Sequence, residues 1–123
     1  MMSAANSSRN NPMSAQITTH TPTFATAPQI EISDLEEIKA LGYKTIICNR
    51  PDGEGGPDQP SSLEVKAQAE KLGLEFHSIP FTSGQLTEGL VKEFAQVIEH
   101  AKGPVLAYCR SGARSTQIWS LGQ

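Results

Sequence analysis

Short apolar runs alternate with segments of helical pattern along most of this chain, and this alternation limits the folds that it can adopt. The clearest run is Thr45–Cys48, which is short, β-branched and apolar, as expected of a strand that is covered on both faces of a parallel sheet. Further strands are predicted near Thr23–Thr26, at Phe76–Ile79 and at Val105–Tyr108. Strands and helices that alternate at these spacings predict an α/β fold, with a mostly parallel sheet flanked by helices.

Capping residues predict where the helices begin. Ser33 with Glu36 and Ser61 with Glu64 each fit a capping box, in which two side chains satisfy the free N–H groups of the first turn. Thr87 is placed to cap a third, longer helix with one apolar stripe. The predicted helices are Asp34–Leu41, Ser61 to about Leu72, Glu88–Ala101 and Arg114–Leu121.

Composition restricts the number of domains and the class of partner. A chain of 123 residues with 37% hydrophobic content is long enough for one core, and residues 1–17 are too polar to fold, so they are expected to form a disordered leader before one domain at 18–123. The net charge of −3 gives no basic excess, so neither nucleic acid nor a membrane surface is an expected partner. The sequence has neither an apolar run of about 20 residues nor a secretory signal, which predicts a cytoplasmic protein.

The predicted strand Val105–Tyr108 leads directly into the segment with the strongest chemical signal, which reads Cys109-Arg110-Ser111-Gly112-Ala113-Arg114-Ser115. A cysteine between a buried strand and a tight turn into a helix lies where backbone N–H groups and a helix N-terminus converge. Such a cradle stabilises an anion, and the first anion is the thiolate itself. Cys109 is therefore the predicted catalytic nucleophile.

The residues after Cys109 are expected to hold the anionic substrate. Arg114 presents a planar fork that can bind two oxygens, and Gly112 allows the backbone to approach closely. Arg110 adds positive charge, and the hydroxyl of Ser115 is expected to donate to the thiolate or to a leaving sulfur. The predicted anion-binding residues are Arg110, Ser111, Gly112, Ala113, Arg114 and Ser115.

Cysteine, acidic and histidine residues outside this segment carry weaker chemical signals. Cys48 ends an apolar strand and is interpreted as core packing rather than as a resolving thiol. Asp52 lies on a loop that can reach the same crevice, which makes it a candidate catalytic acid, although Asp before Gly is also ordinary turn chemistry. His20, His77 and His100 show no spacing typical of a metal site, so neither a metal nor a cofactor is expected.

Three segments, Asn49–Glu54, Ile79–Pro80 and Gly103–Ser115, resemble known proteins. From about Thr21 onward the chain is similar to the dual-specificity, tyrosine-phosphatase-like proteins. It is more closely similar to the bacterial phosphatase-like family found fused to β-lactamase-like hydrolases, the domain of unknown function 442. The resemblance implies a tyrosine/dual-specificity-phosphatase-like fold with Cys109 as nucleophile and Arg114 as oxyanion binder. It also implies further helices after the last one, so the domain is expected to be truncated at its C-terminus.

The sequence departs from the phosphatase pattern at three places. Phosphatases place five residues between the cysteine and the arginine, whereas Cys109 and Arg114 are separated by four, as in rhodanese-like sulfurtransferases. Tyr108 stands where phosphatases have histidine, and Phe81–Gly84 contains no carboxylate where dual-specificity phosphatases carry their general acid. A general acid contributes about 10² to 10⁴ in rate, so its absence weakens the phosphatase interpretation.

The combined prediction is a cysteine-dependent enzyme that acts as a sulfurtransferase through a Cys109 persulfide. The alternative is a phosphatase that hydrolyses phosphomonoesters through a phosphocysteine, with Asp52 as the acid. A third interpretation is an inactive anion-binding regulatory module. The expected partners are a small sulfur donor or a phosphorylated substrate, an acceptor thiol, and a fused or partner domain of sulfur metabolism.

Overall fold

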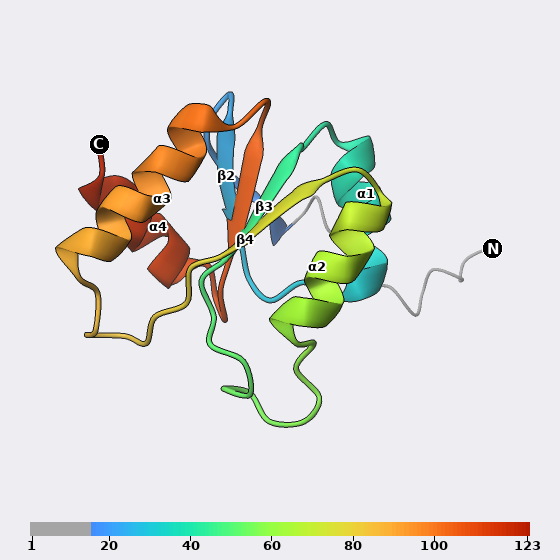
Figure 1. Ribbon diagram of the computed structural model, residues 1–123, viewed down its shortest axis with the longest axis horizontal. Coiled ribbons are helices and arrows are strands. Elements are labelled where there is room, and N and C mark those ends of the chain that lie inside the picture. The colour runs from blue at the N-terminus through green and yellow to red at the C-terminus, as the bar shows by residue number, and fades with distance from the viewer. Residues whose placement is uncertain (1–15) are drawn as a thin grey trace.

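The computed structural model describes residues 16–123, which form a sheet of five strands with helices on both faces (Figure 1). The order of the strands across the sheet is β1-β2-β5-β3-β4, so the strand that leads into Cys109 lies at its centre. The strands are β1 (Thr18–Thr21), β2 (Phe24–Ala27), β3 (Thr45–Cys48), β4 (Glu75–Ser78) and β5 (Val105–Tyr108).

The sheet is mostly parallel, which confirms the predicted fold class. β2, β5, β3 and β4 run parallel to one another, and only β1 is antiparallel, paired with β2 at one edge. Tyr108 on β5 is in register with Ala27 on one side and Cys48 on the other. The carboxyl ends of three strands therefore meet at one edge of the sheet, where ligands bind in folds of this kind.

All four α-helices lie where the sequence predicts helical structure, and a short 3-10 turn that was not predicted precedes the first of them. The Ser61–Glu64 capping box and the Thr87 cap are both present. The box predicted at Ser33 with Glu36 was wrong, because Glu31 and Asp34 form it instead, two residues earlier. The bounds are η3 (Ile32–Asp34), α1 (Leu35–Ala40), α2 (Ser62–Lys71), α3 (Glu88–His100) and α4 (Ala113–Leu121).

Two apolar clusters cover the two faces of the sheet. The helices α1 and α2 pack on one face, around a cluster that includes Ile38, Ile46 and Tyr108. The helices α3 and α4 pack on the other face, around a cluster that includes Phe94 and Ile118 (Figure 1). A central strand with both faces covered is held rigidly, and this rigidity fixes the position of the loop that follows it.

The described residues overlap the end of the predicted leader at positions 16 and 17. Most of that leader lies outside the described residues, but Ile17 packs against the first cluster and Thr18 begins β1. Within residues 16–123, no helix is both long enough and apolar enough to cross a lipid bilayer.

Candidate active site

The loop between β5 and α4 places Cys109 at the carboxyl end of the central strand. Its backbone N–H donates to the carbonyl of Ala27 at 3.4 Å, so the chain still follows β2 as it leaves the sheet. Gly112 then begins α4 as its N-cap, with φ +94° and ψ −14°. This left-handed conformation favours glycine, because side chains with a Cβ rarely adopt it. The glycine therefore allows the short turn from strand to helix.

The Cys109 sulfur is buried and surrounded by backbone N–H groups. The Gly112 N–H donates to Sγ at 3.0 Å. Burial alone would raise the pKa of the Cys109 thiol, but hydrogen bonds from the backbone amides of Ser115, Ser111, Gly112 and Arg114 outweigh it and lower the pKa. The predicted cradle is thus present in the structure, built from main-chain dipoles at a helix N-terminus.

Arg114 is buried against this loop and is already bound to a carboxylate. Its Nη1 donates to Glu54 Oε2 at 2.9 Å and to the carbonyl of Phe81 at 2.9 Å, and its Nη2 donates to Glu54 Oε1 at 2.6 Å. The bond to Glu54 raises the pKa of Arg114, and the nearby Cys109 thiolate adds to this effect. An arginine has five N–H donors, so the three contacts with Glu54 and Phe81 leave two, and a hydrogen bond to Cys109 also raises the pKa of Arg114.

Glu54 joins the two loops of the site. Besides Arg114, its carboxylate binds Arg50 Nε at 2.9 Å, and Arg50 Nη1 donates to Gln29 Oε1 at 3.0 Å. The hydrogen bond from Arg114 lowers the pKa of Glu54 to about 2, with further contributions from Arg50. Glu54 is therefore ionised near neutral pH and does not serve as a proton donor there.

Asn49 and Ser115 connect the same loops at a deeper level. Both are fully buried, and the Ser115 hydroxyl donates to Asn49 Oδ1 at 2.8 Å. Asn49 Nδ2 donates in turn to the carbonyl of Ile79 at 2.9 Å. The predicted bond from the Ser115 hydroxyl to the thiolate is thus replaced by a structural one, and Ser115 reaches Cys109 through its backbone N–H.

The remaining predicted loop residues differ in their contacts. The side chain of Arg110 is exposed. The Ala113 N–H donates to Ser111 Oγ at 3.3 Å rather than toward the sulfur. In this structure the N–H groups of Ser111 and Gly112 contribute to the cradle around Cys109, whereas that of Ala113 does not.

Asp52 lies at the start of α2, where its carboxylate contacts Ser62. Its two carboxylate oxygens accept from the backbone N–H of Ser62 at 2.8 Å and from the Ser62 hydroxyl at 2.9 Å. These contacts fix the loop that follows β3 to the N-terminus of α2, where a negative charge is favourable. A catalytic role for Asp52 stays a prediction, and it requires this carboxylate to leave Ser62.

Cys48 is buried beside Tyr108 in the cluster under α1 and α2. Burial raises the pKa of its thiol, and its sulfur donates to the carbonyl of Arg50 at 3.3 Å. These are the surroundings of an unreactive core cysteine. They agree with the interpretation of Cys48 as core packing.

Sequence reasoning did not identify Glu54 or Asn49 as site residues. A signal for Glu54 exists, because Arg50 and Glu54 are four residues apart and belong to one of the segments that carry the resemblance. A glutamate in a loop rich in Gly and Pro is usually solvated, however, and its contact with Arg114 spans 60 residues. Only the neighbouring positions of β3 and β5 in the sheet bring these two residues together.

The fold and the loop together define a class of protein. A mostly parallel sheet with a buried cysteine at the end of its central strand, an amide cradle and a buried arginine on the next helix is a tyrosine/dual-specificity-phosphatase-like domain. Residues 16–123 match the model of the phosphatase-like domain of β-lactamase hydrolase-like proteins. The chain belongs to this family.

Individual relatives agree with this assignment. A β-lactamase hydrolase-like protein from Agrobacterium fabrum is 37% identical over 97 residues, which are 79% of this chain and 22% of that protein. A Neisseria meningitidis structure described provisionally as a phosphatase is 40% identical with a TM-score of 0.77, covering 85% of this chain and 73% of that one. A domain-of-unknown-function-442 structure from Shewanella putrefaciens, at 17% identity and TM-score 0.74, covers 88% and 67% and shares the fold. The chain thus spans about a fifth of the Agrobacterium relative.

Proposed function

We propose that this domain is a sulfurtransferase that carries sulfur as a persulfide on Cys109. The observation that carries the proposal is the state of the two carboxylates on the loop after β3. Glu54 is held ionised by Arg114, with its pKa at about 2, and Asp52 is bound to Ser62. Cys109 meanwhile has the lowered pKa of a nucleophile. Sulfur transfer matches this arrangement, since its leaving group departs without a proton.

The reaction has two displacement steps at sulfur. The Cys109 thiolate attacks the outer sulfur of a donor such as thiosulfate, an S–S bond forms, and the original S–S bond breaks, so that sulfite leaves with the bonding electron pair. An acceptor thiolate then attacks the outer sulfur of the persulfide. This second step transfers the sulfur and regenerates the Cys109 thiolate, so charge and electrons balance without an external oxidant.

The substrate contacts come from the groups around Cys109. The N–H groups of Ser111, Gly112, Arg114 and Ser115 stabilise the negative charge on the cysteine sulfur and on the persulfide. The donors of Arg114 that Glu54 leaves unused bind the oxygens of the donor molecule. Arg110, whose side chain is exposed, contributes positive charge at the entrance.

Phosphomonoester hydrolysis is the second candidate, and the phosphatase-like fold is what supports it. The Neisseria relative is described provisionally as a phosphatase. In this reaction the same thiolate attacks phosphorus and forms a phosphocysteine, which water then cleaves. The leaving alkoxide or phenolate needs a proton, and Asp52 supplies it after release from Ser62.

The proposal also includes partners and a compartment. A persulfide must be delivered to an acceptor thiol, either a small molecule or a cysteine of a fused or partner domain of sulfur metabolism. A working thiolate requires a reducing environment, and we propose the cytoplasm as that environment.

A paired assay tests the function directly. The same preparation is given thiosulfate with cyanide and, separately, an aryl phosphate. We expect thiocyanate formation to exceed phosphate release, Cys109→Ser to abolish it because a hydroxyl ionises far less readily, and Asp52→Asn to change it less than twofold. Phosphate release that exceeds thiocyanate formation and falls at least tenfold in Asp52→Asn establishes the hydrolase instead. If neither product forms, the domain is an anion-binding module.

A further inference from the structure

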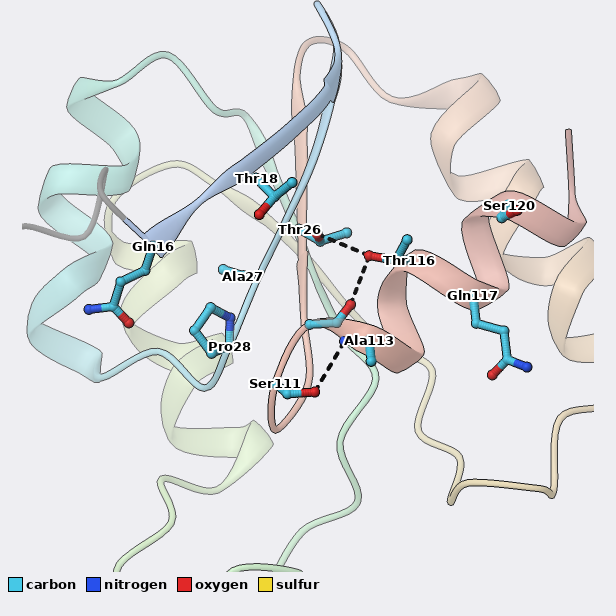
Figure 2. A pocket seen from close by; sticks show the side chains of 11 residues that line it. Gln16, Thr18, Thr26, Ala27, Pro28, Ser111, Ala113, Thr116, Gln117 and Ser120 are labelled. Atoms are coloured by element: carbon cyan, nitrogen blue, oxygen red, sulfur yellow. Dashed lines mark hydrogen bonds between the residues drawn. The ribbon is translucent and has the colours of Figure 1, made fainter.

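A pocket of about 510 Å³ lies beside the Cys109 loop and is lined in part by Ser111 and Gly112 of that loop. It is an open pocket between β1, β2 and α4 (Figure 2). Its polar lining consists of Gln16, Thr18, Thr26, Ser111, Thr116, Gln117 and Ser120. Two of these residues, Thr26 and Thr116, belong to a chain of hydrogen bonds that ends in the loop.

This chain runs from the edge of the sheet to the N-cap of α4. His20 Nε2 on β1 is 2.9 Å from Thr26 Oγ1 on β2, and Thr26 Oγ1 is 3.2 Å from Thr116 Oγ1 on α4. Thr116 Oγ1 then donates to the carbonyl of Gly112 at 2.9 Å, and the Thr116 N–H reaches the same oxygen at 3.0 Å (Figure 2). We call His20, Thr26 and Thr116 the hydroxyl relay.

The direction of every bond in the relay follows from its last acceptor. A carbonyl oxygen cannot donate, so the single hydroxyl proton of Thr116 points at Gly112. Thr26 must then donate its own proton to Thr116, which leaves only acceptor capacity for the bond to His20. His20 therefore donates through a protonated Nε2. All donors in the relay point toward the active-site loop.

Gly112 couples the relay to the thiolate. Its carbonyl receives the relay, and its N–H donates to Cys109 Sγ at 3.0 Å. The two peptide planes that meet at this residue rotate easily, because glycine has no Cβ to restrict its backbone. On the far side of the second plane, the Ala113 N–H is held by Ser111 Oγ (Figure 2). Holding the carbonyl restricts rotation about ψ of Gly112, which is one of the two rotations that would turn the Gly112 N–H away from the sulfur.

We propose that Thr116, Thr26 and His20 are positioning residues that hold the N–H of Gly112 on the sulfur of Cys109. This inference rests on the proposed function, in which the Cys109 thiolate is the nucleophile. A threonine that binds the carbonyl four residues earlier is common in helices. In this protein, however, that carbonyl belongs to the N-cap residue that contacts the nucleophile, and two more residues continue the chain across the sheet.

The test is the pH dependence of Cys109 alkylation by iodoacetamide, followed by mass spectrometry of the modified peptide. Thr116→Val keeps the shape and removes the donor. We expect its alkylation midpoint to move to higher pH and its rate at pH 6.5 to fall about threefold to tenfold, as a weakened bond to a charged sulfur implies. At high pH, where every thiol is ionised, the rates of parent and variant should converge. Lost access or general damage would lower the rate at every pH instead.

Matched variants separate the relay from its surroundings. Thr116→Ser keeps the hydroxyl and should restore the parent midpoint, and Thr18→Val, which alters the same pocket outside the relay, should leave it unchanged. Thr26→Val should shift the midpoint in the same direction by a smaller amount. His20→Phe should also shift the midpoint to higher pH by a smaller amount. This substitution keeps an aromatic ring beside Trp119, whose ring centroid is 5.0 Å from that of His20. If Thr116→Val does not fold, Thr26→Val decides the question.

Two negative outcomes have different meanings. If the parent Cys109 alkylates with the midpoint of an ordinary thiol, near pH 8.5, the proposed function loses its nucleophile. If the parent midpoint is low and Thr116→Val, or Thr26→Val in its place, leaves it unchanged, the function stands and the relay is overturned.

Discussion

At the scale of single residues, Glu54 determines how Arg114 is presented. Its side chain is 27% exposed, yet its carboxylate binds two guanidinium groups, those of Arg114 and Arg50. The resulting geometry holds Arg114 against the Cys109 loop before any substrate arrives. A bidentate pair of this kind is among the stronger hydrogen-bonded contacts that side chains make.

Replacement of Glu54 by Gln should destabilise the domain in a pH-dependent way. The pKa of Glu54 is lowered from 4.5 to about 2, so the stability that its charge provides is fully present above pH 4.5 and is lost as the pH falls toward 2. We expect Glu54→Gln to lower the free energy of unfolding by about 1–2 kcal/mol at pH 7, after allowance for solvent screening. Urea unfolding at pH 7 and near pH 2 measures this.

The control for this prediction is Glu93→Gln, because Glu93 is an exposed residue of α3. It should change the free energy of unfolding by less than about 0.5 kcal/mol at either pH. A Glu54→Gln deficit that is equally large at both pH values would show that packing, and not charge, is what the substitution removes.

At the scale of elements, Asn49 joins β3 to the segment after β4 and to α4. Both of its amide groups are used, one by Ser115 and one by the carbonyl of Ile79. The side chain is fully buried, so nothing else is available to satisfy these partners if it is removed. The active-site loop is therefore anchored by a contact that involves no charge.

Asn49→Ala should lower the free energy of unfolding by about 3 kcal/mol, because it leaves a buried hydroxyl and a buried carbonyl without partners. Ser115→Ala should cost less, since only Asn49 Oδ1 loses its donor. The double variant should lose less free energy of unfolding than the two single variants lose together, because each single variant already removes the contact between Asn49 and Ser115. Urea denaturation of the three proteins gives the coupling, and additive losses would contradict the proposed linkage.

Elements of the sheet differ in how well the sequence predicts them. Thr45–Cys48 and Val105–Tyr108 are found within their predicted bounds, because a strand buried on both faces is apolar at every position. β1 was missed, since its sequence, Thr-Thr-His-Thr, carries no apolar alternation and lies at an exposed edge. The first capping box was placed two residues late because Glu31 is an uncommon N-cap residue.

The candidate site was predictable where its residues are consecutive and not where they are distant. Cys109, Gly112 and Arg114 follow from a single segment, whose strand and helix fix the loop. Glu54 and Asn49 act through side-chain contacts that depend on the sheet order, and no local pattern encodes that order.

At the scale of the whole molecule, the sheet is shared by two cores. Trp119, the single tryptophan of the chain, stacks on Phe24 with ring centroids 5.0 Å apart and reports on the side of α3 and α4. Unfolding of the other core, under α1 and α2, is followed by methods that detect all helices, such as far-ultraviolet circular dichroism. A small domain with a common sheet is expected to unfold as one unit.

Trp119 fluorescence and far-ultraviolet circular dichroism should therefore give the same urea midpoint. The reason is that β5 contributes residues to both clusters, so neither face can lose its packing alone. Both signals are recorded on the same samples across the transition. Midpoints that differ beyond experimental error would mean that the two faces unfold independently.

The contact between Arg114 and Glu54 has a consequence for how an anion enters the site. Two guanidinium groups face one carboxylate, and the Cys109 thiolate supplies a second negative charge when the thiol ionises, so the ionised centre carries its own counter-ions and is close to electrically neutral. Long-range attraction then comes mainly from Arg110, within a chain whose overall charge is negative. Abundant cellular anions will encounter such a site without accumulating in it. Anions are then selected at contact distance, by how well their shape fits the N–H groups around Cys109.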